Sequence, residues 1–200
     1  MIQLPHHAAL IIIDVEKGFD DQKWGTRNNP GAEERIATLL AVWRRTGRPV
    51  FHIQHLSNSE SSPLNPRNPG CEIKEIVRPL EDEPVFQKRV NSAFIGTDLE
   101  NTLRRRGIQT LVIVGLTTPH CISTTARMVA NLGFEVYMAS DAIAAFDIAV
   151  QTGSGIQPKR FTVFPSQRCM RNSQQWLIRK CCWTLWRKPK SSRLGCHAAI

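Results

Sequence analysis

The chain has 200 residues and a mass of 22.6 kDa, enough for one ordinary domain with a single sizeable core. Its 42% hydrophobic and 22% charged residues are typical of globular proteins and argue against wholesale disorder. The longest apolar run, residues 8–13, is too short to cross a membrane, and the first residues lack the pattern of a secretory signal. We therefore expect a cytoplasmic protein whose six cysteines are reduced.

The net charge of +9 is distributed unevenly along the chain. Residues 1–147 hold all 17 acidic residues and 16 of the 26 lysines and arginines, a net charge of −1. Residues 148–200 hold the other ten basic residues and no acid, a net charge of +10. We therefore divide the chain into a domain at 1–147 and a basic tail at 148–200, and the charge that would suggest a nucleic-acid or membrane partner belongs to the tail alone.

Strand and helix patterns alternate through the first 147 residues. Strands are expected at 8–13, 49–55, 84–88, 110–114 and 134–139, and helices at 32–46, 97–107 and about 119–131. The second helix begins with the sequence pattern of a capping box, formed by Thr97 and Glu100. Strands that alternate with helices predict an α/β fold, a doubly wound and mostly parallel sheet with helices on both faces.

In such a sheet, ligands bind beyond the carboxyl ends of the strands. Asp14 ends the first predicted strand, His55 the second and Lys88 the third. The loop after the fourth strand leads to Cys121. These residues therefore form the candidate site, although a single Cys, Asp or Lys in such a domain is more often structural.

Cys121 has the features of a nucleophile. If Thr118 is the N-cap and Pro119 the first helical residue, Cys121 lies in the first helical turn, where the helix dipole favours a thiolate. Free backbone N–H groups there could stabilise an oxyanion. Asp14 would accept the thiol proton, and Lys88 would stabilise the resulting anions.

Three segments resemble the isochorismatase-like cysteine hydrolase family: ALIIIDVEKGF at 9–19, KRVNSAFIGTDL at 88–99 and GLTTPHCISTTAR at 115–127. Their order and spacing are also similar, and the resemblance covers about residues 8–147. It implies an isochorismatase-like fold and a catalytic triad of Asp14, Lys88 and Cys121.

The resemblance further implies a cis peptide bond between Leu116 and Thr117, with an oxyanion hole formed by the backbone N–H groups of Thr117 and Cys121. The implied reaction is hydrolysis of a C–N, amide-type bond of a small molecule through a Cys thioester. Because the family also includes enzymes that cleave a vinyl ether, the triad alone does not name the reaction. The family also suggests a homo-oligomer.

Four other residues are candidates for substrate binding: Phe19, Trp24, His55 and Phe94. Trp24 is equally well explained as a partly exposed packing residue, and His55 as a polar group with its own partner. His52 and His55 are spaced to point to opposite faces of a strand, so we expect no metal site and no cofactor. Pro119 stands where the family would have a polar residue, which leaves the substrate open.

The tail departs from the family, which would supply one more helix and strand. One interpretation is a basic extension whose tryptophans bind nucleic acid or an anionic surface, in a chain that is catalytically impaired or not an enzyme. A second, which we favour, is a frameshift between about residues 145 and 157, because residues 164–179 read one base earlier can encode VSLAALHEEFATVVDT, an amphipathic helix and an apolar strand. A third is a divergent disordered tail. The frameshift predicts that the final helix and strand are missing or replaced, and makes nucleic acid and membrane partners unexpected.

Overall fold

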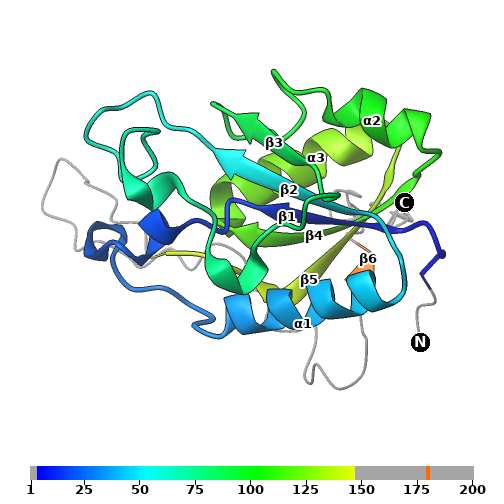
Figure 1. The fold of residues 1–200 in the computed structure, drawn as a ribbon, viewed down its shortest axis with the longest axis horizontal. Helices are drawn as coiled ribbons and strands as arrows, with labels where there is room; N and C mark the ends of the chain where they lie inside the picture. Colours follow the sequence, from blue (N-terminus) through cyan, green and yellow to red (C-terminus); the bar gives the residue numbers. More distant parts are fainter. Residues whose placement is uncertain (1–3, 147–178, 181–200) are drawn as a thin grey trace, which may run out of the picture.

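The structure is a computed structural model that describes residues 4–146 and 179–180 (Figure 1). The predicted domain at 1–147 is therefore almost wholly described, whereas the predicted tail at 148–200 lies outside the described residues except for 179–180. The same holds for the predicted loss of the final helix and strand. In the part of the chain that is described, no helix has the length and apolar character needed to span a bilayer.

In the described residues, six strands form one sheet in the order β3-β2-β1-β4-β5-β6. The first five run parallel, and β6 pairs antiparallel with β5 through two residues. The strands are β1 (Ala9–Ile13), β2 (Val50–His55), β3 (Val85–Lys88), β4 (Thr110–Leu116), β5 (Glu135–Ala144) and β6 (Arg179–Lys180). The predicted parallel α/β architecture is confirmed.

Within the part of the chain that the structure describes, three α-helices cover the two faces of the sheet (Figure 1). They are α1 (Ala32–Arg45), α2 (Leu99–Arg105) and α3 (Ser123–Asn131). The connections contain 3₁₀ turns at Lys17–Asp20, Gln22–Trp24, Pro69–Cys71 and Glu75–Val77, and a π-helical turn at Thr118–Ile122. The core therefore consists of two apolar layers, one on each side of the sheet.

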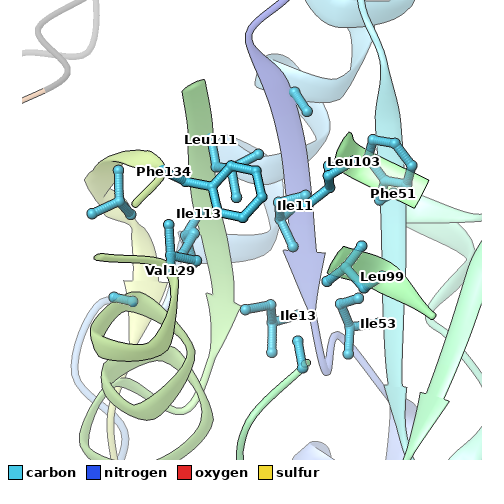
Figure 2. Close-up of a cluster of buried hydrophobic side chains, with 14 of the residues drawn as sticks. Ile11, Ile13, Phe51, Ile53, Leu99, Leu103, Leu111, Ile113, Val129 and Phe134 are labelled. Atoms are coloured by element: carbon cyan, nitrogen blue, oxygen red, sulfur yellow. The ribbon is translucent and has the colours of Figure 1, made fainter. Parts of the chain in front are cut away.

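Strand β1 is buried on both faces, because its alternate side chains enter different layers. Leu10 and Ile12 pack in the layer beneath α1, where Trp43 also lies. Ile11 and Ile13 pack in the opposite layer, which holds side chains of α2 and α3. Figure 2 shows this second layer, with Leu99, Leu103 and Val129 gathered around Ile11, Ile13, Phe51, Ile53, Leu111, Ile113 and Phe134. Burial on both faces explains why the strand is a continuous apolar run in the sequence.

The predicted capping box is wrong. Helix α2 begins at Leu99 with Asp98 as its N-cap. The Thr97 hydroxyl donates to the backbone carbonyl of Ala93 and accepts a hydrogen bond from the backbone N–H of Leu99, not of Glu100. The Glu100 carboxylate pairs with Arg104 one turn along the helix. This cation at i+4 competes for the carboxylate that the capping box would direct back to Thr97.

Strands β1 and β4 approach closely where they lead into the candidate site. Ile13 is paired with Gly115, whose φ of +124° belongs to a region that favours glycine. A Cβ atom at this position would lie 1.9 Å from the carbonyl oxygen of Ile13. Gly115 therefore allows the two strand ends that carry Asp14 and the Cys121 loop to lie side by side.

Candidate active site

Three strand ends bring a carboxylate, an ammonium and a thiol together. Asp14 follows β1 with a φ of +53°, Lys88 is the last residue of β3, and Cys121 lies in the π-helical turn after β4. The Lys88 Nζ atom lies 2.7 Å from Asp14 Oδ2 and 3.3 Å from Cys121 Sγ. All three side chains are buried. The residues predicted as a group are thus in mutual contact.

The environment of Cys121 favours the thiol in the resting protein. Burial raises the pKa of the Cys121 thiol, the nearby Asp14 carboxylate raises it further, and the Lys88 ammonium opposes both effects. Thr117 is the N-cap of the turn, so Cys121 is its fourth residue and not the third as predicted. Any lowering of the thiol pKa by the start of the helix is therefore smaller than the rise caused by burial. For the sulfur to act as a nucleophile, its proton must first be removed.

Asp14 is suited to accept that proton. Burial raises the pKa of its carboxyl group, and the ion pair with Lys88 opposes the rise. Its second oxygen, Oδ1, is buried and has no hydrogen-bond partner among the described residues. Asp14 thus combines increased basicity with an unoccupied acceptor atom.

His55 completes the surroundings of Lys88. Its Nδ1 atom lies 3.1 Å from Lys88 Nζ, in agreement with the register that pairs the two residues on β2 and β3. Burial, together with the Lys88 charge, lowers the pKa of His55 to about 4. The ring is therefore neutral near pH 7, and it is half-buried in the site.

Glu16 is a buried carboxyl group that the sequence did not indicate. Its Oε1 atom accepts a hydrogen bond from the backbone N–H of His55, and Oε2 has no partner among the described residues. Burial and the negative charge of Asp14 raise the pKa of Glu16 to about 9. Glu16 is therefore protonated near pH 7. No pattern in the sequence marked Glu16, because its role follows from burial beside Asp14.

A cavity of about 380 Å³ opens onto the buried groups. One wall is aromatic: the Phe19 ring centroid lies 5.2 Å from that of Trp24 and 6.1 Å from that of Phe146. The indole N–H of Trp24 donates to the carbonyl of Gly18, which fixes the ring. The remaining lining residues are Asp14, Lys23, His55, Leu64, Asn91, Thr117, Pro119, His120 and Cys121.

The structure places the other predicted residues as follows. Phe19, Trp24 and His55 line the cavity, whereas Phe94 does not. The Phe94 ring packs against the apolar layer of α2 and α3 and lies 6.3 Å from Phe134, so its closeness to Lys88 in sequence was misleading. The peptide bond between Leu116 and Thr117 is cis, at the position that the resemblance implies.

The cavity contains residues that sequence reasoning missed. Leu64 comes from the long loop after β2, Asn91 from the turn after β3, and Phe146 from the segment after β5. Loops and chain ends bring them together, so no periodicity in the sequence marks them.

The surroundings of His55 and His52 indicate whether either residue could bind a metal ion. Donor atoms of Asp14, His55 and Cys121 lie within 4.8 Å of one another. However, the Lys88 ammonium is at hydrogen-bond distance from all three, and its charge would repel a cation there. His52 faces away from them and lies 2.9 Å from Glu83, so the two histidines of β2 have separate partners.

Comparison with known proteins identifies the family of this chain. The model of the isochorismatase domain matches residues 8–154. This chain belongs to the isochorismatase family. An uncharacterized isochorismatase family protein of Bacillus subtilis, YrdC, is 55% identical over 143 residues, which cover 72% of this chain and 76% of that protein.

Other proteins are also similar to this chain in sequence or in structure. The crystal structure of a hydrolase of the family from Chromobacterium violaceum has a TM-score of 0.72 and 40% identity, and the match covers 76% of this chain and 78% of that one. Nicotinamidase 3 of Arabidopsis thaliana is 30% identical over 153 residues, covering 70% of this chain and 74% of that protein. The family thus includes a protein named for hydrolysis of an amide.

Proposed function

We propose that this isochorismatase-family hydrolase cleaves an amide-type C–N bond of a small molecule, with Cys121 as the nucleophile. The observation that carries the proposal is the contact of Lys88 Nζ with both Asp14 and Cys121, two residues that line the cavity. A thiol, a base and a fixed cation are the parts that nucleophilic catalysis by cysteine requires. Kinship with a nicotinamidase favours an amide over other substrates.

In the proposed reaction, Asp14 takes the proton of the Cys121 thiol as the sulfur attacks the carbonyl carbon. The carbonyl oxygen becomes an oxyanion, which accepts hydrogen bonds from the backbone N–H groups of Thr117 and Cys121. When the C–N bond breaks, Asp14 returns the proton to the leaving amine, and the acyl group remains on Cys121 as a thioester. Water then attacks the thioester, releases the acid and restores the thiol.

Lys88 keeps its positive charge throughout this cycle. In the resting protein the ammonium balances the Asp14 carboxylate, and after proton transfer it balances the thiolate of Cys121, whose sulfur lies 3.3 Å from Nζ in the structure. The negative charge therefore moves between two neighbours of one buried cation, so the site needs little reorganisation during the reaction.

The size and lining of the cavity limit the substrate. About 380 Å³ suits a small molecule, and the aromatic wall of Phe19, Trp24 and Phe146 suits a planar or apolar group beside the amide. Lys23 lies at the edge of this wall, with its Nζ atom 5.4 Å from the Trp24 ring centroid.

A hydrolysis screen with small primary and secondary amides tests the proposal. We expect release of the amine by the native protein and none by Cys121→Ala. Mass spectrometry of the enzyme quenched in acid during turnover should show the acyl group on Cys121. Hydrolysis that survives in Cys121→Ala, or an acyl group found on another residue, would contradict the proposed mechanism.

A further inference from the structure

The Lys88 ammonium has three hydrogen-bond partners, and one of them has no part in the proposed reaction. An ammonium carries three N–H donors and no acceptor. Lys88 Nζ uses them on Asp14 Oδ2, Cys121 Sγ and His55 Nδ1, at 2.7, 3.3 and 3.1 Å. The first two are the base and the nucleophile, and His55 is the third support of the cation.

These contacts fix the protonation of the His55 ring. Since the ammonium can only donate, His55 Nδ1 must accept and carries no proton. The neutral ring then has its proton on Nε2. The backbone of Val90 raises the pKa of the ring, as it would if it accepted the Nε2 proton. The neutral ring that the Lys88 contact requires therefore also suits its surroundings on the Val90 side.

The backbone of His55 is itself held by a hydrogen bond. The buried Glu16 carboxyl group accepts a hydrogen bond from the backbone N–H of His55. Lys88 lies on β3, which is two strands away from β1, so its long side chain must cross the end of β2 to reach Asp14. His55 is the residue of β2 that it passes.

We propose that His55 is a positioning residue, whose neutral Nε2–H ring holds the Lys88 ammonium against the sulfur of Cys121. Three partners leave the ammonium one orientation, in which one N–H points at the sulfur. Without His55, the third N–H would seek water or turn toward the cavity, and the cation would stabilise the thiolate less well. The inference concerns the free protein, so its test does not depend on the proposed substrate.

The first measurement uses the unmodified protein. Long-range ¹H–¹⁵N NMR spectra distinguish a bare ring nitrogen from a protonated one. The chain has six histidines, so the His55 signals are assigned by their loss in His55→Asn. We expect a bare Nδ1 and a protonated Nε2 near neutral pH. A proton on Nδ1 would overturn the proposal.

The second measurement is the rate at which iodoacetamide alkylates Cys121, followed by peptide mass mapping because the chain has five other cysteines. His55→Leu fills the space without an acceptor, whereas the Asn oxygen in His55→Asn can take the place of Nδ1. Loss of one hydrogen bond to a charged group should slow alkylation of His55→Leu about tenfold or more. His55→Asn should recover most of the rate.

Two controls separate positioning from a general loss of structure. Circular dichroism and the thermal transition show whether each variant is folded, and the alkylation rate of Cys71 should not change, since it has no contact with Lys88. Equal rates in the Leu and Asn variants, whether both fast or both slow, would overturn the proposal. If His55→Leu does not fold, the NMR result decides.

Discussion

Asp14 has two opposing effects on the reactivity of the Cys121 sulfur. Its negative charge raises the pKa of the thiol, yet its carboxylate is the proposed acceptor of the thiol proton. In Asp14→Asn the charge is removed and Lys88 keeps a neutral partner. We expect faster alkylation of Cys121 near pH 7, because Lys88 then faces the sulfur without a competing anion. Amide hydrolysis should fall by about 10²–10⁴-fold, the usual loss of a general base.

The opposite movement of the two rates is the diagnostic result. Damage to the fold would slow both reactions, so the thermal transition of Asp14→Asn is measured alongside them. Hydrolysis that persists at the native rate in a folded Asp14→Asn would exclude Asp14 as the base.

Glu16 makes stability depend on pH in an unusual direction for a carboxyl group. Its pKa is about 9 in the folded chain, against an ordinary value of 4.5. Between these values the unfolded chain releases a proton that the folded chain retains, so stability falls as pH rises, by at most about 1.4 kcal/mol per pH unit. Glu16→Gln, which cannot ionise, should unfold at a higher temperature than the native chain near pH 8.

The comparison at low pH serves as the control for Glu16→Gln. Well below pH 4.5, both the folded and the unfolded states of the native chain hold the proton on Glu16, so the two proteins should unfold at similar temperatures. A gap that is the same at both pH values would mean that the substitution acts through packing rather than through ionisation.

Single residues of the site were predictable from sequence to different degrees. Asp14, Lys88 and Cys121 could be identified because parallel strands end at one edge of a sheet, and because the motifs around them resemble a family. Glu16 and Phe146 could not, since their roles follow from burial and from the course of loops. Phe94 was misplaced because closeness in sequence to Lys88 does not determine which way a ring points.

At the level of secondary-structure elements, the pairing of β1 with β4 depends on one glycine. In Gly115→Ala the added Cβ would meet the Ile13 carbonyl at 1.9 Å, so the strands must separate beside the site. We expect a loss of more than about 4 kcal/mol, or failure to fold. Gly107→Ala is the matched control, with a φ of +64° and no atom within 4 Å of the new Cβ. It should cost only about 1–2 kcal/mol.

Urea unfolding of both glycine variants measures this difference. Similar losses in Gly115→Ala and Gly107→Ala would show that the backbone conformation matters and the close approach of the strands does not.

The strands and helices themselves were well predicted, because burial on both faces gives β1 and β4 a continuous apolar pattern. Boundaries were less predictable. Strand β5 continues to Ala144, beyond the predicted end at residue 139, through polar residues. The register between β4 and β5 shifts next to Gly115, which a pattern of alternating residues cannot reveal. The start of α2 also differed, because local hydrogen bonds competed with the capping box.

At the scale of the whole molecule, the charge of the chain changes at residue 147, and the match to the family model ends seven residues later, at 154. The relation of the tail to the domain is still a prediction. If the frameshift is correct, a chain whose residues 148–200 are replaced by the shifted translation should gain a helix and a longer strand against β5, which pairs with β6 in the described residues through Tyr137 and Met138. Covering more of that edge should raise the unfolding temperature and reduce aggregation.

Thermal unfolding and size-exclusion chromatography of the two chains test this expectation. A native chain that is monomeric and unfolds above about 60 °C would contradict it, since that is the upper range for ordinary domains. Coding DNA that is incompatible with the shifted translation would exclude the frameshift directly.

The resting thiol of Cys121 also affects how the protein withstands oxidants. Peroxides react with thiolates and hardly with thiols. Burial and the raised pKa of the Cys121 thiol leave almost no thiolate for a peroxide to attack. Under the proposed mechanism, a nucleophile that depends on Asp14 for deprotonation would be protected from conversion to sulfenic acid, at the expense of a proton transfer in every turnover.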